Sequence, residues 1–323
     1  MIKYTSSSAR MWSRLGPSGA FGAAALELGE TDPLALMVTA DLRFFAGLDR
    51  FATAYPDRLL NLGIAEQNMV GVAAGFASEG FHVFASTYAT FGALRSADQV
   101  KVNMGYMRLP VKLVGLAAGF SAGILGPTHM ALEDAAAMRA IPNITVLSPA
   151  DGMEIVKSTL AAAKLDKPVY LRLTGAMGCP AVYHDDYEFE IGKAIRLTEG
   201  SDALLIATGS MVYRALEAAK LLADRGISCT VCDMHTIKPL DTSFIDAMLS
   251  GHKHVFTLEE HSVFGGLGEA VAAHLVISAA VPLTIIGVED FYPHAGEYEN
   301  LMEQAGLAVL QLAEKIERTM RVG

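Results

Sequence analysis

The chain has 323 residues, of which 52% are hydrophobic and 19% charged, and its formal net charge is -10. This length accommodates two domains of ordinary size, and the composition is that of a globular protein, which excludes a disordered or fibrous one. The negative balance argues against a nucleic-acid partner, because phosphate binding requires a basic face.

The N-terminal segment is a poor signal peptide. Arg10 and Arg14 precede an apolar stretch that Gly and Pro interrupt. The longest apolar run, residues 113–125, is too short to cross a bilayer, so we expect no membrane partner. The chain has three cysteines, a number that fits a reducing compartment, and we expect a cytoplasmic protein.

Buried strands and helices alternate along the first half of the chain. The expected strands span residues 34–39, 82–86, 111–116, 144–147 and 169–173, and the expected helices span residues 66–79, 93–103, 128–140 and 151–163. Thr128 suits the N-cap of the third helix, which Pro142 would end. Strands joined by helical crossovers predict a doubly wound parallel sheet that is covered on both faces.

A break in the pattern separates two domains. Residues 175–192 hold Gly, Pro and an acidic, Tyr-rich run in which Asp185 and Asp186 suit a solvated face better than a metal site. The alternation then restarts. Expected strands follow at 203–208, 229–234, 254–259 and 283–288, with helices at 211–225, 268–278 and from 298 onwards. We predict an α/β fold with a first domain at 1–180, a linker at 181–195 and a second α/β domain at 196–323.

Cys229 and Cys232 form a C-x-x-C motif inside a predicted strand. Their odd spacing places the two side chains on opposite faces of a sheet. We therefore expect neither a zinc site nor a redox pair here, and no metal site in this chain.

Glu66 is an acid in a Gly- and Ala-rich stretch that opens an apolar helix. Burying an ionisable group costs free energy unless a partner compensates it. Glu66 could instead face solvent, where the helix dipole favours a carboxylate at the helix start. The local sequence alone leaves two interpretations open: a buried Glu66 that has a partner, and a Glu66 that faces solvent.

Several stretches together carry a resemblance to a known family. In the first domain they are residues 61–67 (NLGIAEQ), Tyr88 with Phe91, 126–134 (GPTHMALED), 139–143 (RAIPN) and 148–151 (SPAD); in the second they are 233–241 (DMHTIKPLD) and 259–261 (EEH). The first set resembles the pyrimidine-binding domain of transketolases, and the second resembles the transketolase C-terminal domain. The resemblance covers nearly the whole chain and implies the fold of those two domains.

The resemblance also implies a missing half. Full-length transketolases begin with a domain that binds diphosphate and metal through a Gly-Asp-Gly motif, which this sequence lacks. A split enzyme is implied, in which this subunit is inactive without a smaller transketolase N-terminal-like subunit that holds Mg²⁺ or Ca²⁺. The expected assembly is a heterotetramer built on a two-fold dimer. It would use thiamin diphosphate to transfer a two-carbon ketol unit from a ketose to an aldehyde.

The resemblance assigns roles to individual residues. Glu66 is matched to the catalytic acid that hydrogen-bonds the N1′ atom of the aminopyrimidine, and His129 to a catalytic histidine that contacts substrate. The residues matched to cofactor-binding positions are Asp41, Leu42, Ile64, Glu66, Tyr88 and Phe91. The alternatives are a strand-end cap for Asp41, plain core for the two aromatic residues, and a bond from His129 to Glu133.

Departures from the family pattern concern the substrate. Leu125 replaces an Asp that usually reads a sugar hydroxyl, Ala117 replaces a phosphosugar-binding His, and Phe45 replaces a phosphate-binding Ser. Apolar replacements remove hydrogen bonds that a sugar phosphate needs. Arg172 and Arg14 are candidates for the remaining anion contacts, with surface arginines as the alternative. We expect a drier substrate pocket than that of a common transketolase.

Three other functions stay open at this stage. Two share the architecture: a decarboxylating carboligase resembling deoxyxylulose-phosphate synthase, and the β subunit of a 2-oxoacid dehydrogenase E1. The stretch 128–134 (THMALED) favours a transketolase over the dehydrogenase. The third is a non-catalytic regulatory homologue, against which the retention of Glu66 and His129 argues.

Overall fold

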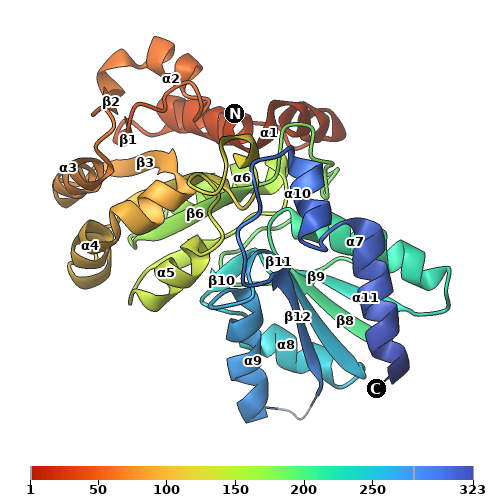
Figure 1. Cartoon of the computed structure of the whole chain (residues 1–323). Coiled ribbons are helices and arrows are strands. Elements are labelled where there is room, and N and C mark those ends of the chain that lie inside the picture. The colour runs from red at the N-terminus through yellow and green to blue at the C-terminus, as the bar shows by residue number, and fades with distance from the viewer. Residues whose placement is uncertain (1, 279–280, 323) are drawn as a thin grey trace.

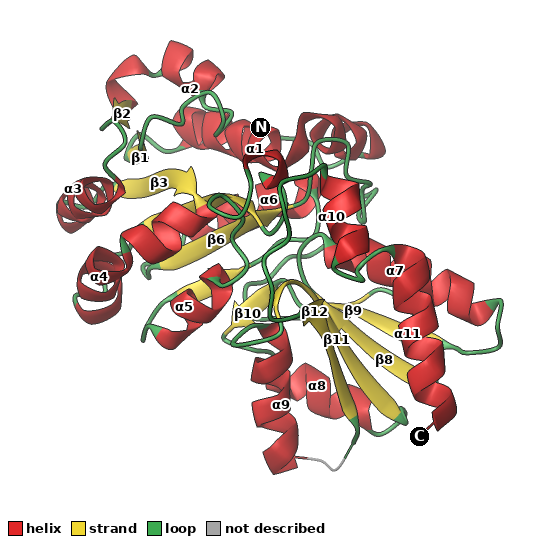
Figure 2. Cartoon of the chain, in the orientation of Figure 1, coloured by secondary structure: helices red, strands yellow, loops and turns green. Residues whose placement is uncertain are grey.

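The chain folds into two neighbouring α/β units, each built around one sheet (Figure 1). The computed structural model describes residues 2–278 and 281–322. The first unit occupies the upper left of the view and the second the lower right, with long loops from both units running between them. Figure 2 shows helices on both sides of each sheet. This confirms the predicted fold class.

The first sheet has the strand order β10-β5-β6-β4-β3-β1-β2. Its strands are β1 (Ala35–Thr39), β2 (Leu59–Asn61), β3 (His82–Tyr88), β4 (Lys112–Ala118), β5 (Thr145–Leu147), β6 (Val169–Thr174) and β10 (Thr236–Lys238). The first six run parallel, whereas β10 comes from the second half of the chain and pairs antiparallel with β5. The sheet is therefore mixed, and the second half of the chain contributes one strand, β10, to it.

Helices cover both faces of this sheet. They are α1 (Ser6–Thr31), α2 (Asp49–Ala54), α3 (Glu66–Ser78), α4 (Ala97–Gln99), α5 (Asp134–Ala140) and α6 (Gly152–Ala163), with π-helical segments at Phe91–Arg95 and Val100–Tyr106 and 3₁₀ turns at Pro56–Arg58 and Gly123–Leu125. Alternate residues of β1 serve the two faces, as the period of a strand requires. Ala35 and Met37 pack in a core with α1, whereas Leu36 and Val38 pack in a separate core with α3.

The second sheet has the order β12-β11-β8-β9-β7. Its elements are β7 (Ile195–Arg196), β8 (Ala203–Ala207), β9 (Cys229–Asp233), β11 (His254–Ser262) and β12 (Leu283–Val288), with α7 (Met211–Ala223), α8 (Thr242–Leu249), α9 (Leu267–Ser278), α10 (Tyr298–Gln304) and α11 (Val309–Val322). Edge strand β7 is antiparallel. The core under α7 is continuous with the core under α1 and α6, so the two units share buried apolar surface.

The two cysteines of the C-x-x-C motif lie on opposite faces of β9, as predicted. Cys229 packs in the core that includes α7, and Cys232 packs in the core that includes α8 and α9. Both thiols are free. Burial raises the pKa of each to about 12, which makes the thiolate scarce and the groups unreactive.

Two expected helices are corrected. The helix expected at 128–140 begins only at Asp134, because residues 119–131 form a loop closed by a bridge between Gly119 and Ala131. Thr128 caps no helix, and its hydroxyl lies 3.1 Å from the His129 ring. The helix expected at 93–103 is a succession of π-helical, α-helical and π-helical segments.

Several elements were not anticipated from the sequence: helices α1, α2 and α8 and the short strands β2, β7 and β10. Helix α1 is kinked at Gly16, which has a φ of 74° and is followed by Pro17, and these residues obscure the helical pattern in the sequence. Strand β10 has only three residues and finds its partner in the other unit. Among the described residues, no helix combines the length and apolarity that a membrane crossing requires.

Candidate active site

The predicted cofactor residues gather at one edge of the first sheet. Strand β1 lies between β2 and β3, so the chain leaves β1 in one direction and later returns on its other side. Thr39 pairs with Asn61 and with Ser86, which brings the carboxyl ends of these three parallel strands to one level. Ligands of open α/β sheets bind at such a switch of strand order, outside the carboxyl ends.

Most of the candidates lie in the segments that follow β1, β2, β3 and the neighbouring strand β4. Asp41 and Leu42 follow β1, Ile64 and Glu66 follow β2, Tyr88 ends β3 and Phe91 comes three residues later, and Leu125 and His129 lie in the loop after β4. Parallel pairing of the strands thus brings to one edge of the sheet residues that lie up to 88 positions apart in the sequence. Arg14 on α1 and Arg172 inside β6 are not at these strand ends.

Asp41 fastens the loops after β1 and β2 to each other. Its backbone is left-handed, with a φ of 60°. The Asn61 side-chain amide donates to Asp41 Oδ1 over 3.1 Å, and Asn61 Oδ1 accepts from the backbone N–H groups of Asp41 and Gly63. A strand-end cap, the alternative for Asp41, is what these contacts show. We call these hydrogen bonds between Asp41, Asn61 and Gly63 the Asp41–Asn61 clasp. Ile64 follows it directly and is 75% exposed.

Glu66 is the first residue of α3 and is only 3% exposed. The solvent-facing alternative is therefore wrong for this chain. Arg95 Nη1 donates to both carboxylate oxygens at 2.9 Å. Sequence reasoning missed Arg95, although it is the only charged residue between His82 and Asp98 in the sequence, in an otherwise uncharged stretch. The available signal for this pair was an isolated Arg95 in an uncharged stretch, together with Glu66, an acid that would need a partner if buried.

Tyr88, Phe91 and His129 form a cluster of rings. The His129 centroid lies 5.4 Å from Tyr88 and 5.2 Å from Phe91, and the two aromatic rings are 5.9 Å apart, all in edge-to-face arrangements. Phe45 extends the cluster, at 6.4 Å from Tyr88. Tyr88 and Phe91 are half-buried and belong to none of the hydrophobic cores of the described residues. Partial burial raises the pKa of Tyr88.

His129 does not bond to Glu133, which was the structural alternative. The carboxylate of Glu133 accepts from the backbone N–H of Leu132 and from the Tyr292 hydroxyl. His129 Nδ1 faces the Thr128 hydroxyl, which leaves the rest of the ring against Tyr88 and Phe91. The histidine is thus held at the mouth of the aromatic cluster.

Arg172 is an anchor beneath this loop. It is 1% exposed, and its Nε donates to Asp134 Oδ2 over 2.8 Å. Its Nη2 donates to the carbonyls of Ala131 and Glu260, which ties the base of the His129 loop to β11. Burial lowers the pKa of Arg172, but the ion pair with Asp134 outweighs it and the net shift is upward. The expected substrate contact is corrected, because the guanidinium is enclosed.

The other two expected substrate residues are open to solvent. Leu125 is 49% exposed in the 3₁₀ turn of the loop after β4. Arg14 is exposed on α1, and no hydrogen bond, ion pair or ring contact in the described part of the chain joins it to the aromatic cluster. The neighbouring Ser13 carbonyl accepts from the N–H of Gly178.

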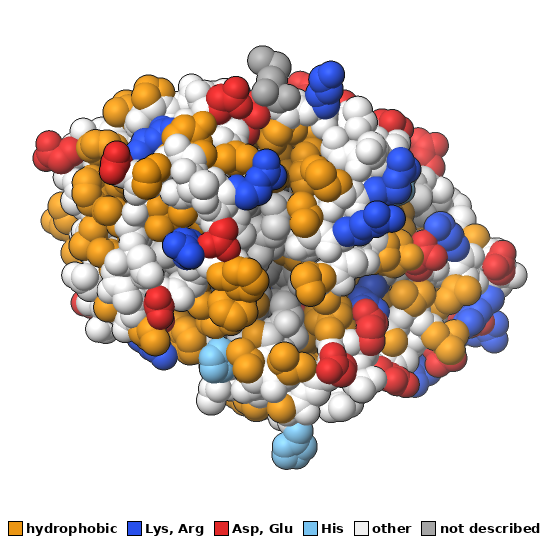
Figure 3. Space-filling model, turned by 90° about the horizontal axis from the view of Figure 1, so that it is seen from above, with side chains coloured by type: hydrophobic (Ala, Val, Ile, Leu, Met, Phe, Trp, Pro, Cys, Tyr) orange, Lys and Arg blue, Asp and Glu red, His pale blue; other side chains and the backbone are white. Residues whose placement is uncertain are grey.

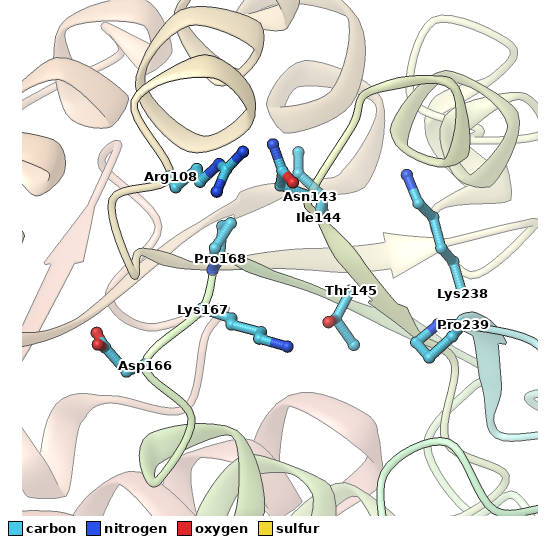
Figure 4. A pocket seen from close by; sticks show the side chains of 9 residues that line it. All are labelled: Arg108, Asn143, Ile144, Thr145, Asp166, Lys167, Pro168, Lys238 and Pro239. Atoms are coloured by element: carbon cyan, nitrogen blue, oxygen red, sulfur yellow. The ribbon is translucent and has the colours of Figure 1, made fainter.

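Two cavities lie away from these residues. One of about 490 Å³ is lined by Arg108, Asn143, Ile144, Thr145, Asp166, Lys167, Pro168, Lys238 and Pro239 (Figure 4). The ammonium of Lys238 donates to the carbonyls of Arg139 and Ile141, so it is already engaged. The second cavity, of about 220 Å³, includes Glu133 and Tyr292. Neither cavity contains a residue of the ring cluster or Glu66.

Comparison with known proteins decides the family. The model of the transketolase pyrimidine-binding domain matches residues 17–177, and that of the transketolase C-terminal domain matches residues 192–312. The chain belongs to the transketolase family. It is a subunit of a transketolase-type transferase, and membership of the family implies dependence on thiamin diphosphate.

The similar proteins include separate transketolase subunits. The chain is 39% identical to the 6-deoxy-6-sulfo-D-fructose transketolase subunit of Clostridium sp. (strain MSTE9) over 89% of each chain. It is 38% identical to one subunit of the apulose-4-phosphate transketolase of Phocaeicola vulgatus, over 87% of this chain and 90% of that one. A solved split-gene transketolase, described as an inactive beta4 tetramer, has a TM-score of 0.84 at 38% identity and is covered to 97%.

The residues fit the aminopyrimidine end of the cofactor. They offer a buried carboxylate beside half-buried aromatic rings at a strand-order switch, with the apolar Ile64 standing out next to them. No group of three or more His, Cys, Asp or Glu side chains within residues 2–278 and 281–322 is placed to hold a metal ion. A partner subunit is implied by the family's split members.

Proposed function

We propose that this chain supplies the aminopyrimidine-binding half of a split transketolase, which transfers a two-carbon ketol unit from a ketose to an aldehyde. The observation that carries the proposal is the carboxylate of Glu66. It is buried at the start of α3, after β2, and Arg95 links it to the Phe91 ring of the cluster. Its charge is paired with the half-exposed Arg95, and its place at a switch of strand order supports a role toward a bound ring.

Each residue then has a defined task. Bound thiamin diphosphate supplies the nucleophilic carbon of the reaction. Glu66 holds a proton at N1′ of the aminopyrimidine, Tyr88 and Phe91 contact the ring, and Leu42 and Ile64 pack beside it. Asp41 keeps its part of the site in place through the clasp with Asn61. Proton transfer by a positioned carboxylate contributes about 10²–10⁴-fold to a rate.

His129 is proposed to exchange protons with the substrate hydroxyls. Its ring lies against Tyr88 and Phe91, so a molecule bound beside the cofactor ring would meet it. The loop that carries it is pinned at its base by Arg172 and by the Gly119–Ala131 bridge. A positioned imidazole of this kind can both donate and accept a proton, as general acid–base catalysis requires.

The diphosphate and its metal, Mg²⁺ or Ca²⁺, are assigned to a smaller partner subunit that resembles the transketolase N-terminal domain. Two copies of each chain are proposed to form a heterotetramer around a two-fold axis. Exposed apolar residues near the site, Phe44, Phe45 and Ile64, support an interface here. Apolar side chains also gather in groups between charged ones on the side shown in Figure 3. The three free thiols favour the cytoplasm as the location.

The substrates are proposed to differ from common pentose phosphates. Phe45 presents an apolar ring beside the cluster, Leu125 is exposed in the loop that also carries His129, and the arginine expected to bind an anion, Arg172, is enclosed. The unusual sugars in the names of the two similar subunits, a sulfofructose and apulose 4-phosphate, support a specialised substrate. Arg14 is the proposed residue for an anionic end of the substrate.

The test is replacement of Glu66 by Ala in the complex reconstituted with the partner subunit. We expect steady-state turnover to fall by about 10²–10⁴-fold, because the variant lacks the carboxylate that would hydrogen-bond N1′. Glu79→Gln, at the exposed C-terminal end of the same helix, is the matched control and should leave turnover unchanged. Normal turnover of the Glu66→Ala complex would remove the catalytic role.

A further inference from the structure

Arg95 contacts Glu66 and Phe91, two residues that are proposed above to bind the cofactor ring. Its Nη1 lies 2.9 Å from each carboxylate oxygen of Glu66. Its guanidinium carbon lies 4.0 Å from the centroid of the Phe91 ring. One planar cation therefore contacts the acid and the aromatic ring at the same time.

Burial shows which of the two partners faces solvent. The side chain of Glu66 is 3% exposed, whereas that of Arg95 is 46% exposed. Arg95 therefore lies between the carboxylate and bulk water. Water has almost no access to Glu66, so another donor approaching from the open face meets the position of Arg95 first.

The chemistry of the guanidinium matches that of the aminopyrimidine. Both are flat, delocalised groups that present N–H donors at their edge and a face to an aromatic ring. A carboxylate buried without a donor is costly, and Arg95 removes that cost while the ring is absent.

We propose that Arg95 is a self-ligand of the cofactor-free subunit, which fills the aminopyrimidine position until thiamin diphosphate displaces it from Glu66. This inference rests on the proposed role of Glu66. Arg95 can move because it sits at the end of the π-helical segment Phe91–Arg95 with nearly half of its side chain in solvent. Cofactor binding then exchanges one partner of Glu66 for another.

This exchange of partners predicts how a substitution of Arg95 changes the melting temperature and the Kd for thiamin diphosphate. In the complex of Arg95→Gln with the partner subunit, the self-ligand is weakened and Glu66 is left short of a partner. The cofactor-free complex should therefore melt at a lower temperature. Thiamin diphosphate should bind more tightly, with a Kd lowered by about fivefold, the size expected for one partly exposed ion pair.

Binding is measured by isothermal titration with thiamin diphosphate and the metal, and melting by scanning fluorimetry without and with the cofactor. Arg95→Lys keeps the charge but loses the plane over Phe91, so its Kd should lie between those of the wild type and Arg95→Gln. Glu66→Gln and the double variant Glu66→Gln/Arg95→Gln should have equal Kd values, because Arg95 then has no carboxylate to occupy. Arg225→Gln, which breaks another partly exposed pair with Glu317, is the control and should leave the Kd unchanged.

Two contrary results have different meanings. An unchanged or raised Kd in both Arg95 variants, with Glu66→Ala still abolishing turnover, overturns the self-ligand alone and leaves the proposed function standing. If Glu66→Ala changes neither binding nor turnover, the proposed function fails as well.

Discussion

Two carboxyl groups, Glu154 on α6 and Asp233 on β9, are fully buried at the seam between the two units. The Tyr183 hydroxyl donates to Asp233 Oδ2, and the Tyr187 hydroxyl donates to Glu154 Oε1. Among the described residues Asp233 Oδ1 has no hydrogen-bond donor, and a proton on the neighbouring Glu154 would supply one. Burial raises the pKa of Asp233 to about 7, and burial together with the Asp233 charge raises that of Glu154 well above its usual range.

This pair makes stability depend on pH in a definite direction. Unfolded carboxyl groups lose their protons near pH 4, so between about pH 4 and 7 the folded chain holds more protons than the unfolded one. The free energy of unfolding therefore falls as pH rises through that interval, by about 1.4 kcal/mol per pH unit for each retained proton. The melting temperature of the wild type should drop between pH 5 and pH 8.

In Glu154→Gln this drop should be shallower, because the amide donates to Asp233 without titrating. It should not vanish, since Glu259 is also buried with a pKa raised to about 7. Glu314→Gln on the exposed side of α11 is the matched control. An equal slope in the wild type and in Glu154→Gln would show that the two buried carboxyls do not share a proton.

Several elements meet at the base of the loop that carries His129. Arg172 of β6 links Asp134 of α5, the carbonyl of Ala131 and the carbonyl of Glu260 on β11. The carboxylate of Glu260 in turn accepts from the N–H of Phe120 and from the Tyr298 hydroxyl of α10. Gly119 allows this approach, because a Cβ there would stand 2.2 Å from Glu260 Oε1. The loop is thus fixed by elements of both units.

Replacing Arg172 by Met tests its role as an anchor. We expect the free energy of unfolding to fall by about 3–5 kcal/mol, because Asp134 is left buried without a counter-ion. Urea unfolding followed by circular dichroism measures the loss. Arg14→Met is the comparison, and an exposed arginine should change stability by less than about 0.5 kcal/mol. A raised KM for substrate with unaltered stability in Arg172→Met would restore the original expectation of a substrate contact.

The elements show which parts of the fold the sequence could predict. Helix α3 was expected at 66–79 and runs from Glu66 to Ser78, because its period and its start are local signals. The helix expected at 128–140 was wrong at its start, since Arg172 and the Gly119–Ala131 bridge hold the preceding residues as a loop. Strand β10 depends on a partner about 90 residues away in sequence, which no local pattern reveals.

The site shows the same division. Glu66, Tyr88 and His129 could be chosen from motifs, and the order of the parallel strands explains why they meet. Arg95 could not be chosen, because whether a lone arginine covers a buried acid depends on how a π-helical segment turns beside α3. Arg172 reads as a surface or substrate residue until β6 is known to be buried on both faces.

At the scale of the whole molecule, the candidate residues stand near the ends of parallel strands and are proposed to form half of a site. Ile64, two residues before the buried Glu66, is exposed, and so is Phe44 in the loop after β1. In the proposed enzyme the cofactor is bound between two different subunits. Neither subunit should hold it firmly alone.

The most direct measurement is equilibrium binding of thiamin diphosphate with Mg²⁺ to this chain, to the partner subunit and to their mixture. We predict tight binding in the mixture alone, with one cofactor for each pair of chains. Tight binding or turnover by this chain without the partner would contradict the proposal.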